Sequence, residues 1–172
     1  GQTLFQIYGK YFAGREEDQK KITQELNDYE KDMPYVPVKG AFEFIAELRK
    51  RGVTTAIVTS SNKPKMENVY RHYPEFKDLV GHIFTSEFVT RSKPDPQCFL
   101  NAMEALGAPV SETVVFEDSI NGLKAARASG AYVVGLLTSN PAEVVKPMCD
   151  YSIEDFTSFT PEDLSKVSGI DF

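Results

Sequence analysis

Short apolar runs alternate with segments of helical periodicity from about residue 40 onward, and this alternation constrains the fold more than any other feature. Residues 53–58, Val-Thr-Thr-Ala-Ile-Val, form a β-branched run typical of a strand buried on both faces. Further strands are expected at 82–84, 113–116 and 132–137, with helices at 41–48, 66–73, 96–106 and 120–129. Strands that alternate with helices predict βαβ units, and therefore an α/β fold around a parallel sheet.

Two later helix starts carry a capping residue followed by proline. In Asn140-Pro141-Ala142-Glu143 the asparagine is a cap residue, the proline takes the first helical position and the glutamate suits a capping box. Thr160-Pro161-Glu162-Asp163 repeats the cap and the proline. We therefore expect helices to begin at both places, with Asn140 and Thr160 as their N-caps.

The first 33 residues show helical spacing without any strand-like run. Apolar side chains recur among many charges at Leu4, Tyr8, Phe12, Ile22, Leu26 and Tyr29. This pattern predicts two amphipathic helices separated near Gly14. Pro34-Tyr35-Val36-Pro37 then predicts a stiff, extended link, because each proline disfavours helix in the residue before it. We expect residues 1–34 to form a helical appendage hinged to an α/β body of residues 35–172; the alternative is that these helices pack directly on the sheet.

Length, charge and cysteine content exclude some classes of protein. The 172 residues suffice for one domain with a small appendage. A net charge of −6 without a basic stripe argues against nucleic acid as a partner. No window approaches the roughly 18 apolar residues of a membrane helix, so we expect no membrane association. Cys98 and Cys149 lie far apart and in no metal-ligand spacing, which favours reduced thiols in a cytoplasmic protein.

The adjacent acids Glu117 and Asp118 directly follow the apolar run at 113–116. Parallel α/β sheets bind their ligands at the carboxyl ends of strands, where adjacent carboxylates repel each other and lose hydration. A hard divalent cation with oxygen ligands would compensate this charge. In the alternative interpretation, Asp118 only caps the following helix and Glu117 is solvated.

Two more polar clusters follow predicted strands. Thr59-Ser60-Ser61-Asn62-Lys63 offers hydroxyls and backbone amides that suit the oxygens of a phosphate group, although such residues also cap helices. Arg91-Ser92-Lys93-Pro94-Asp95-Pro96 sets Lys93 beside two prolines, which suits a fixed charge contact; the alternative is a surface lysine in a rigid loop. One edge of a parallel sheet would gather all three clusters.

The order of these clusters, a hydroxyl, then a lysine, then an acid pair, resembles the haloacid dehalogenase-like superfamily of phosphotransferases. The matching segments are Ile57-Val58-Thr59-Ser60-Ser61, Ser92-Lys93-Pro94-Asp95-Pro96, and Val115-Phe116-Glu117-Asp118-Ser119 with Gly122 and Ala125-Ala126. Lys-Pro-x-Pro followed by Glu-Asp-Ser is most similar to the β-phosphoglucomutase and phosphoglycolate phosphatase branch. The resemblance covers roughly residues 20–155. It implies a Rossmann-like parallel sheet flanked by helices, with residues 1–34 as part of a helical cap.

The resemblance also implies roles for individual residues. Thr59, with Ser60 as the alternative, resembles the hydroxyl that bonds the transferring phosphoryl group. Lys93 resembles the lysine that neutralises that group and the nucleophile. Glu117 and Asp118 resemble the acids of a Mg²⁺ site, which contact the ion directly or through water. The phosphate- and substrate-binding loop corresponds to Ser60, Ser61, Asn62 and Lys63.

One part of the family pattern has no match in this chain. The family begins with a strand ending in Asp-x-Asp, where the first aspartate becomes an aspartyl phosphate and the second is the general acid and base. That strand lies between those expected here at 53–58 and 113–116, so its absence would leave two unpaired edges in a buried sheet. We therefore expect an N-terminally incomplete chain, inactive by itself, whose missing segment completes the sheet.

The implied function is Mg²⁺-dependent phosphoryl transfer, by a phosphatase or a phosphomutase, on a small phosphorylated metabolite such as a sugar phosphate. The alternative is a noncatalytic binding or scaffold protein that retains the fold. A dehalogenase fits less well because those members lack a Mg²⁺ requirement. Phosphorylation-receiver domains carry the acids, the hydroxyl and the lysine in a different order. Substrate identity and oligomeric state stay open.

Overall fold

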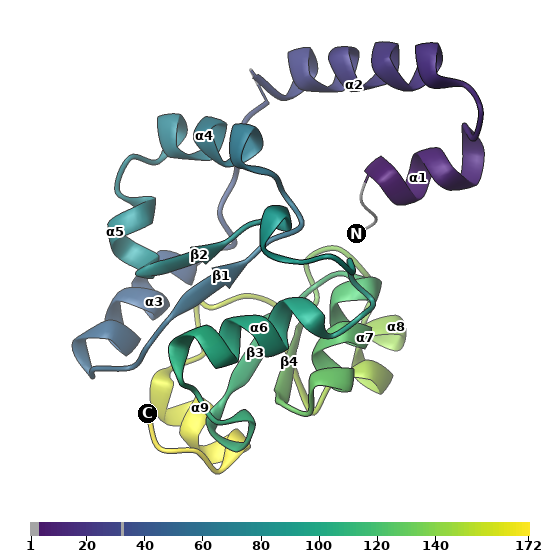
Figure 1. The fold of residues 1–172 in the computed structure, drawn as a ribbon. Coiled ribbons are helices and arrows are strands. Elements are labelled where there is room, and N and C mark those ends of the chain that lie inside the picture. Colours follow the sequence, from purple (N-terminus) through teal and green to yellow (C-terminus); the bar gives the residue numbers. More distant parts are fainter. Residues whose placement is uncertain (1–3, 32) are drawn as a thin grey trace.

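A computed structural model describes residues 4–31 and 33–172 of the chain (Figure 1). The α-helices are α1 (Leu4–Tyr11), α2 (Glu16–Lys31), α3 (Ala41–Lys50), α4 (Lys63–His72), α5 (Phe76–Val80), α6 (Gln97–Leu106), α7 (Ile120–Ser129), α8 (Ala142–Val145) and α9 (Pro161–Ser168). The strands are β1 (Ala56–Val58), β2 (His82–Phe84), β3 (Val114–Glu117), β4 (Tyr132–Leu136) and β5 (Tyr151–Ile153). Short 3₁₀ turns are η1 (Ser86–Phe88), η2 (Val110–Glu112) and η3 (Lys146–Met148). The predicted α/β alternation is confirmed; α5 and β5 were not predicted.

Within the described residues, the strands form two parallel sheets, and no hydrogen-bonded ladder joins β1 to β3. In one sheet β1 pairs with β2, and Ile57 lies opposite Ile83. In the other sheet β4 lies between β3 and β5, and Glu117 at the end of β3 lies opposite Gly135. Because all these pairs are parallel, the carboxyl ends of paired strands lie at the same edge.

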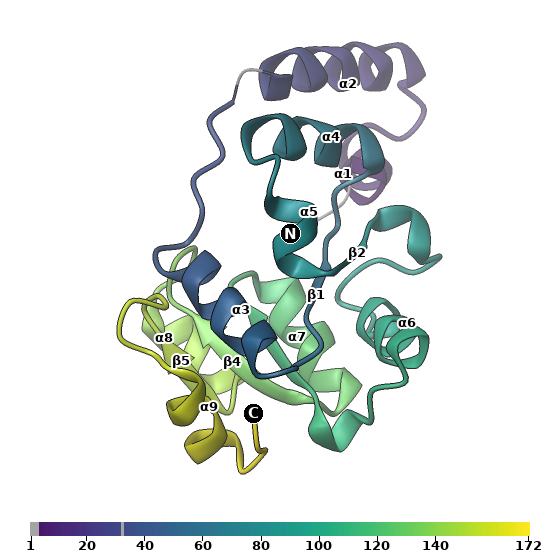
Figure 2. The same cartoon turned by 90° about the vertical axis from the view of Figure 1, so that its left-hand side faces the viewer.

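Apolar side chains cover both faces of the sheet that contains β4. Val133 and Val134 are fully buried and point to opposite faces, as successive residues of a strand do. Val133 belongs to a cluster with side chains of α6 and α7, including Phe99 and Leu123. Val134 belongs to a cluster with side chains of α3 and α9, including Leu164. The sheet therefore lies between two helical layers, which can be followed in Figure 2.

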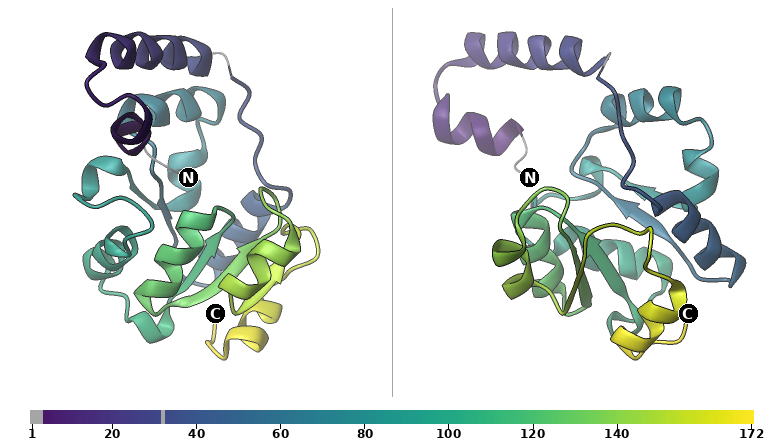
Figure 3. Two further views of the ribbon diagram at one scale, coloured as in Figure 1. Left: turned by 90° about the vertical axis from the view of Figure 1, so that its right-hand side faces the viewer. Right: turned by 180° about the vertical axis from the view of Figure 1, so that it is seen from behind.

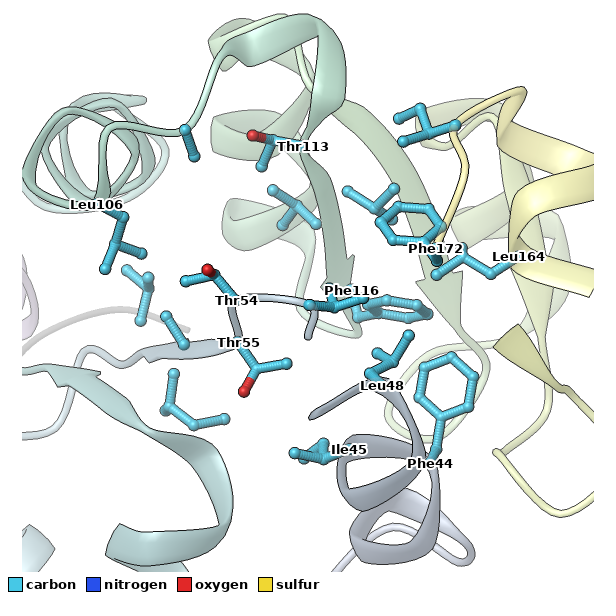
Figure 4. A pocket seen from close by; sticks show the side chains of 18 of the residues that line it. Phe44, Ile45, Leu48, Thr54, Thr55, Leu106, Thr113, Phe116, Leu164 and Phe172 are labelled. Atoms are coloured by element: carbon cyan, nitrogen blue, oxygen red, sulfur yellow. The ribbon is translucent and has the colours of Figure 1, made fainter. Parts of the chain in front are cut away.

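A slot separates β1 from β3 (Figure 4). It forms a cavity of about 1150 Å³, lined by Thr54 and Thr55 on one side and by Thr113 and Phe116 on the other. The residues of β1 are only half-buried, and the strand begins at Ala56. The prediction of a strand over residues 53–58 that is buried on both faces is therefore wrong in its extent and its burial. The physical reason is that one edge of β1 has no neighbouring strand among the described residues.

The two N-terminal helices, α1 and α2, lie together at one end of the molecule (Figures 1 and 3). They are separated at Gly14, as predicted, and its φ of +74° is a conformation that favours glycine. Helix α2 contacts α4 through an ion pair in which Lys65 Nζ lies 2.7 Å from Glu30 Oε1. Residues 1–3 and 32 of the predicted appendage lie outside the described residues. The division of the chain at residue 34 stays a prediction. None of the described helices has the length and apolarity needed to cross a membrane.

The two predicted capping motifs have different outcomes. At α9 the prediction is confirmed, because Thr160 Oγ1 accepts from the N–H of Asp163 while the Asp163 carboxylate accepts from the N–H of Thr160. At α8 it is wrong, because Pro141 stands at the N-cap without a side-chain hydrogen bond. The amide of Asn140 donates instead to the main-chain oxygen of Asp118.

Candidate functional site

The loops that follow β1 and β3 meet where Lys93 bridges them. Lys93 Nζ donates a hydrogen bond to the main-chain oxygen of Val58 at 3.4 Å and forms an ion pair with Glu117 Oε1. Only 8% of the Lys93 side chain and 10% of the Glu117 side chain are exposed. Since Thr59 follows Val58 and Asp118 follows Glu117, this ammonium group lies where the three predicted clusters meet.

Packing and a hydrogen-bonded loop hold Lys93 in place. Its ammonium group lies 4.7 Å from the centroid of the Phe99 ring, in a cation–π contact. In the loop before α6, Gln97 Oε1 accepts from the N–H of Arg91 at 2.8 Å. The backbone N–H of Gln97 and the guanidinium group of Arg91 lower the pKa of Asp95, so this carboxylate stays charged and ties the loop together. Lys93 is therefore a buried, fixed charge, and the interpretation as a surface lysine is wrong.

Both carboxylate oxygens of Glu117 are engaged. Oε1 faces Lys93, while Oε2 accepts from the N–H of Asp118 at 3.2 Å and from the N–H and hydroxyl of Ser119 at 3.3 and 3.1 Å. The carboxylate lies against Gly122 in the first turn of α7, where a Cβ atom would overlap it. Removing one partner of a buried ion pair typically costs about 3–5 kcal/mol, because a buried charge is left unpaired. The interpretation of Glu117 as a solvated surface acid is therefore wrong.

The loop after β1 presents the hydroxyl of Thr59 at the end of the strand. The N–H of Thr59 donates to the main-chain oxygen of Phe84 at 2.9 Å, which continues the contact with β2 beyond Val58. Thr59 Oγ1 accepts from the N–H of Ser61 at 3.0 Å. Asn62 Oδ1 accepts from the N–H of Lys65 at 3.0 Å and so caps α4. The backbone of the loop is thereby folded around the hydroxyl.

The segment after β2 supports this loop from the side. The N–H of Lys63 donates to Glu87 Oε1 at 3.0 Å, and the N–H of Ser86 donates to the main-chain oxygen of Ser61 at 3.0 Å. Hydrogen bonds from the Thr85 hydroxyl and the Lys63 N–H lower the pKa of Glu87. Glu87 therefore keeps its charge and its hold on the loop at neutral pH. The phosphate- and substrate-binding roles of residues 59–63 stay predictions.

Asp118 does not cap α7, so that alternative is wrong. The N-cap is Ser119, whose Oγ accepts from the N–H of Gly122 at 3.1 Å. Asp118 is half-buried, and its Oδ2 accepts hydrogen bonds from the hydroxyls of Ser139 and, at 3.3 Å, of Thr138. These two residues follow β4 and were not predicted. They could have been found from sequence, because they are hydroxyl residues directly after a predicted strand. The same pattern indicated the loop after β1.

Helix α1 reaches the site through Gln6. Its Nε2 donates to the main-chain oxygen of Lys93 at 3.3 Å, across 87 residues of sequence. The helical spacing of the N-terminal segment did not indicate this contact, because its partner is far away in the sequence. The contact of Gln6 ties α1 to the loop that carries Lys93, and the ion pair between Lys65 and Glu30 ties α2 to α4.

The acids fit a Mg²⁺ site unequally. In residues 4–31 and 33–172, no group of three or more acidic, histidine or cysteine side chains is arranged to hold a metal ion. The carboxylate of Asp118 fits, because it accepts from neutral hydroxyls and is a hard oxygen ligand of the kind Mg²⁺ prefers. Glu117 fits only through a water molecule, because its oxygens already face Lys93 and three neutral donors. The Mg²⁺ roles of both residues stay predictions.

Backbone groups of β1 and β3 face the slot. The N–H and C=O of one residue point to the same side of a strand, and successive residues alternate. The N–H of Thr59 bonds to the end of β2 and the oxygen of Thr113 bonds to the start of β4. Val58 in β1 and both Val114 and Phe116 in β3 therefore direct their backbone groups into the slot. Two facing strand edges of this kind can accept one extended segment between them.

Comparison with known proteins gives consistent results. Residues 4–130 match the family described as haloacid dehalogenase-like hydrolase. Over 127 residues the chain is 34% identical to validoxylamine A 7'-phosphate phosphatase from Streptomyces hygroscopicus subsp. limoneus, covering 73% of this chain and 59% of that protein. The chain thus spans less than two thirds of the length of this curated relative.

Solved structures match over most of the chain. A HAD hydrolase of family IA, variant 3, from Entamoeba histolytica HM-1:IMSS has a TM-score of 0.77 at 25% identity, covering 89% of this chain and 72% of the other. β-Phosphoglucomutase from Clostridium difficile has a TM-score of 0.75 at 16% identity, covering 95% of this chain and 73% of the other. At the latter identity the likeness concerns the fold alone.

Proposed function

Because this chain belongs to the haloacid dehalogenase-like hydrolases, we propose that it carries the phosphoryl-binding part of a phosphatase or phosphomutase. One observation carries the proposal: the buried ammonium group of Lys93 bridges the carboxyl ends of β1 and β3. A fixed and largely dehydrated cation suits the charge of a phosphoryl group, because phosphoryl transfer depends mainly on positioning and charge neutralisation.

The substrate we propose is a small phosphorylated metabolite, with sugar phosphates and similar polyol phosphates as the first class to test. The curated relative described above is named as a phosphatase of a 7'-phosphate, which supports a phosphate monoester as substrate. We expect the activity in the cytoplasm, where thiols such as Cys98 and Cys149 stay reduced.

The hydroxyl of Thr59 is suited to donate to a phosphoryl oxygen. Its Oγ1 already accepts from the N–H of Ser61. A hydroxyl has one proton to donate, and this proton is not used by the bond to Ser61. The phosphoryl group would therefore lie between the Thr59 hydroxyl and the Lys93 ammonium group. The remaining loop residues, Ser60, Ser61, Asn62 and Lys63, would face the rest of the substrate.

A Mg²⁺ ion would be held by Asp118 directly and by Glu117 through water, with further oxygens supplied by the substrate. When bound, the ion neutralises charge on the phosphoryl oxygens. Asp118 supplies a carboxylate at the strand end, and Glu117 keeps Lys93 in place through their ion pair. The two acids would thus have different roles: Asp118 would bind the cation, and Glu117 would orient Lys93.

The nucleophile would enter with a strand that fills the slot between β1 and β3. We propose an extended segment that is apolar on both faces and ends in Asp-x-Asp. Both strand edges are in place, and apolar side chains such as Leu48 of α3 and Met103 of α6 line the slot. Such a strand would end beside Val58, whose oxygen accepts from Lys93. This would bring the first aspartate next to the ammonium group.

The reaction would then take two steps. A carboxylate oxygen of the first aspartate attacks phosphorus, the bond to the ester oxygen breaks, and the second aspartate protonates the leaving alcohol. The second aspartate next removes a proton from water, which attacks phosphorus and releases inorganic phosphate while the aspartate is regenerated. In a mutase a second sugar hydroxyl would attack in place of water.

Activity assays test this proposal. Protein expressed from the complete open reading frame that contains these residues should release phosphate from sugar phosphates with Mg²⁺ and not with EDTA. Residues 1–172 alone should be inactive. Asp118→Asn should raise the Mg²⁺ concentration needed for half-maximal rate while leaving the fold intact. Absence of turnover from the complete protein would contradict the proposal and favour a noncatalytic scaffold.

Hydrogen–deuterium exchange tests the slot independently of activity. The amides of Val114 and Phe116 should exchange quickly in residues 1–172 and become protected in the complete protein. Val115 is the matched control, because its N–H points toward β4 and should be protected in both forms. Equal exchange of Val114 and Phe116 in the two forms would contradict a strand in the slot.

A further inference from the structure

The loop after β4, Thr138-Ser139-Asn140, is held against Asp118 and is not used to cap a helix. Asn140 Nδ2 donates to the main-chain oxygen of Asp118 at 2.8 Å. Helix α8 starts two residues later, with Pro141 at its N-cap and no side-chain hydrogen bond there. Asn140 is half-buried, and its side-chain amide donates this hydrogen bond inside the fold. Asn140, which the sequence predicted as the N-cap of α8, therefore holds the loop between β3 and α7 in place.

Two hydroxyls of the same loop fix the carboxylate group. Thr138 Oγ1 lies 3.3 Å from Asp118 Oδ2, and Ser139 Oγ donates to the same oxygen. Among the described residues, no hydrogen bond or ion pair involves the other oxygen, Oδ1. The carboxylate is thus anchored through one oxygen, while the second is left available for a ligand.

The pairing of β3 with β4 makes this arrangement an inherent part of the sheet. Glu117, the last residue of β3, lies opposite Gly135 in β4. The residues that follow the two strands therefore leave the sheet side by side, which brings the loop after β4 next to Asp118.

From these contacts we infer that Thr138, Ser139 and Asn140 are positioning residues that orient Asp118 as a cation ligand. The inference rests on the proposed function. The two hydroxyls restrict rotation of the carboxylate without neutralising its charge, and the Asn140 amide fixes the backbone that carries it. A lysine or arginine partner would instead compete with the cation. Hydrogen-bond partners behind a metal ligand are typically worth about 10- to 100-fold in metal affinity.

The test measures the dissociation constant of Mg²⁺ alone by isothermal titration calorimetry, with protein from the complete open reading frame. Ser139→Ala and Asn140→Ala should each raise this constant by about 10-fold or more. Ser139→Thr retains the hydroxyl and should bind Mg²⁺ as the wild type does. Asn101→Ala is the matched control, because the Asn101 amide also donates to a main-chain oxygen, that of Phe88 at 3.4 Å, away from Asp118.

Asp118→Asn, measured in parallel, separates this inference from the proposed function. If Asp118→Asn weakens Mg²⁺ binding but Ser139→Ala and Asn140→Ala do not, the positioning role is overturned and the metal site stands. If Asp118→Asn leaves binding unchanged, the metal site fails and the positioning role fails with it. Melting temperatures in EDTA identify any variant that is simply unfolded. Ser139 is exposed, so Ser139→Ala should melt with the wild type and decides the question if Asn140→Ala does not fold.

Discussion

Replacing Gly122 by alanine tests how tightly the buried ion pair is packed. A Cβ atom at this position would overlap the carboxyl carbon and both carboxylate oxygens of Glu117. Gly122 lies in the first turn of α7 with a helical backbone, so alanine introduces no backbone strain of its own. The effect of the substitution therefore comes from displacing Glu117 or moving the helix.

The magnitude follows from the easier of these two movements. If Glu117 turns away, Lys93 is left without its partner. Because the Lys93 side chain is only 8% exposed, this unpaired charge costs about 3–5 kcal/mol. If α7 instead moves away from Glu117, overpacking costs about 1–3 kcal/mol. We expect the upper end of this range because the Cβ would overlap three atoms of the Glu117 carboxylate. Alanine is about 1 kcal/mol better than glycine inside a helix. We expect a net loss of about 2 kcal/mol in the free energy of unfolding.

Urea denaturation measures this loss, with two controls. Gly9→Ala also adds a methyl group inside a helix, but nothing lies within 4 Å of its Cβ, so it should be neutral or stabilising by up to about 1 kcal/mol. In a Glu117→Ala background, Gly122→Ala should likewise become neutral or stabilising. If Gly122→Ala costs the same in both backgrounds, contact with Glu117 is not the reason for glycine at this position.

Three further changes probe the site, the C-terminal helix and the sheet. Lys93→Ala should lower turnover by about 100-fold or more, through lost charge stabilisation. Adding Glu117→Gln should restore stability but not turnover, and wild-type phosphate release by Lys93→Ala would place the lysine outside the reaction. Hydrogen bonds from the N-cap of α9 lower the pKa of Asp163, so its stabilisation is present above its unfolded pKa of about 3.9 and is lost as pH falls through the lower folded value. The difference in unfolding free energy between wild type and Asp163→Ala should therefore be largest at pH 7 and shrink as pH falls below about 3.9; a difference independent of pH would contradict this. Gly135→Ala brings a Cβ atom to 2.9 Å from Cys149 Sγ, so it should cost about 1–3 kcal/mol in urea denaturation, and an unchanged midpoint would contradict that packing.

Elements with strong local signals were predictable from sequence. Helix α7 spans Ile120–Ser129 as expected, because helical spacing and the following Gly130 both act within a few residues. The approach of Lys93 to the end of β1 and to Glu117 was predictable too. It follows from a general property of parallel sheets, whose carboxyl strand ends lie at one edge.

Features that depend on distant contacts were not predictable. Strand β5 has only three residues, Tyr151–Ile153, and is a strand because β4 pairs with it. Asn140 has a local pattern typical of a helix N-cap, but its side-chain amide donates to the main-chain oxygen of Asp118 instead. The ion pair between Lys93 and Glu117 joins residues 24 positions apart, and no local pattern indicates which acid would take the lysine.

Under the proposed function, the slot between β1 and β3 is a receptor site for a single strand. Strand addition to an exposed edge is a general mode of peptide recognition, and here an incoming segment would gain two edges at once. A synthetic peptide that carries the acidic residues could then switch the chemistry on by complementation. If such a peptide restores activity, the same chain could be engineered as one half of a split reporter.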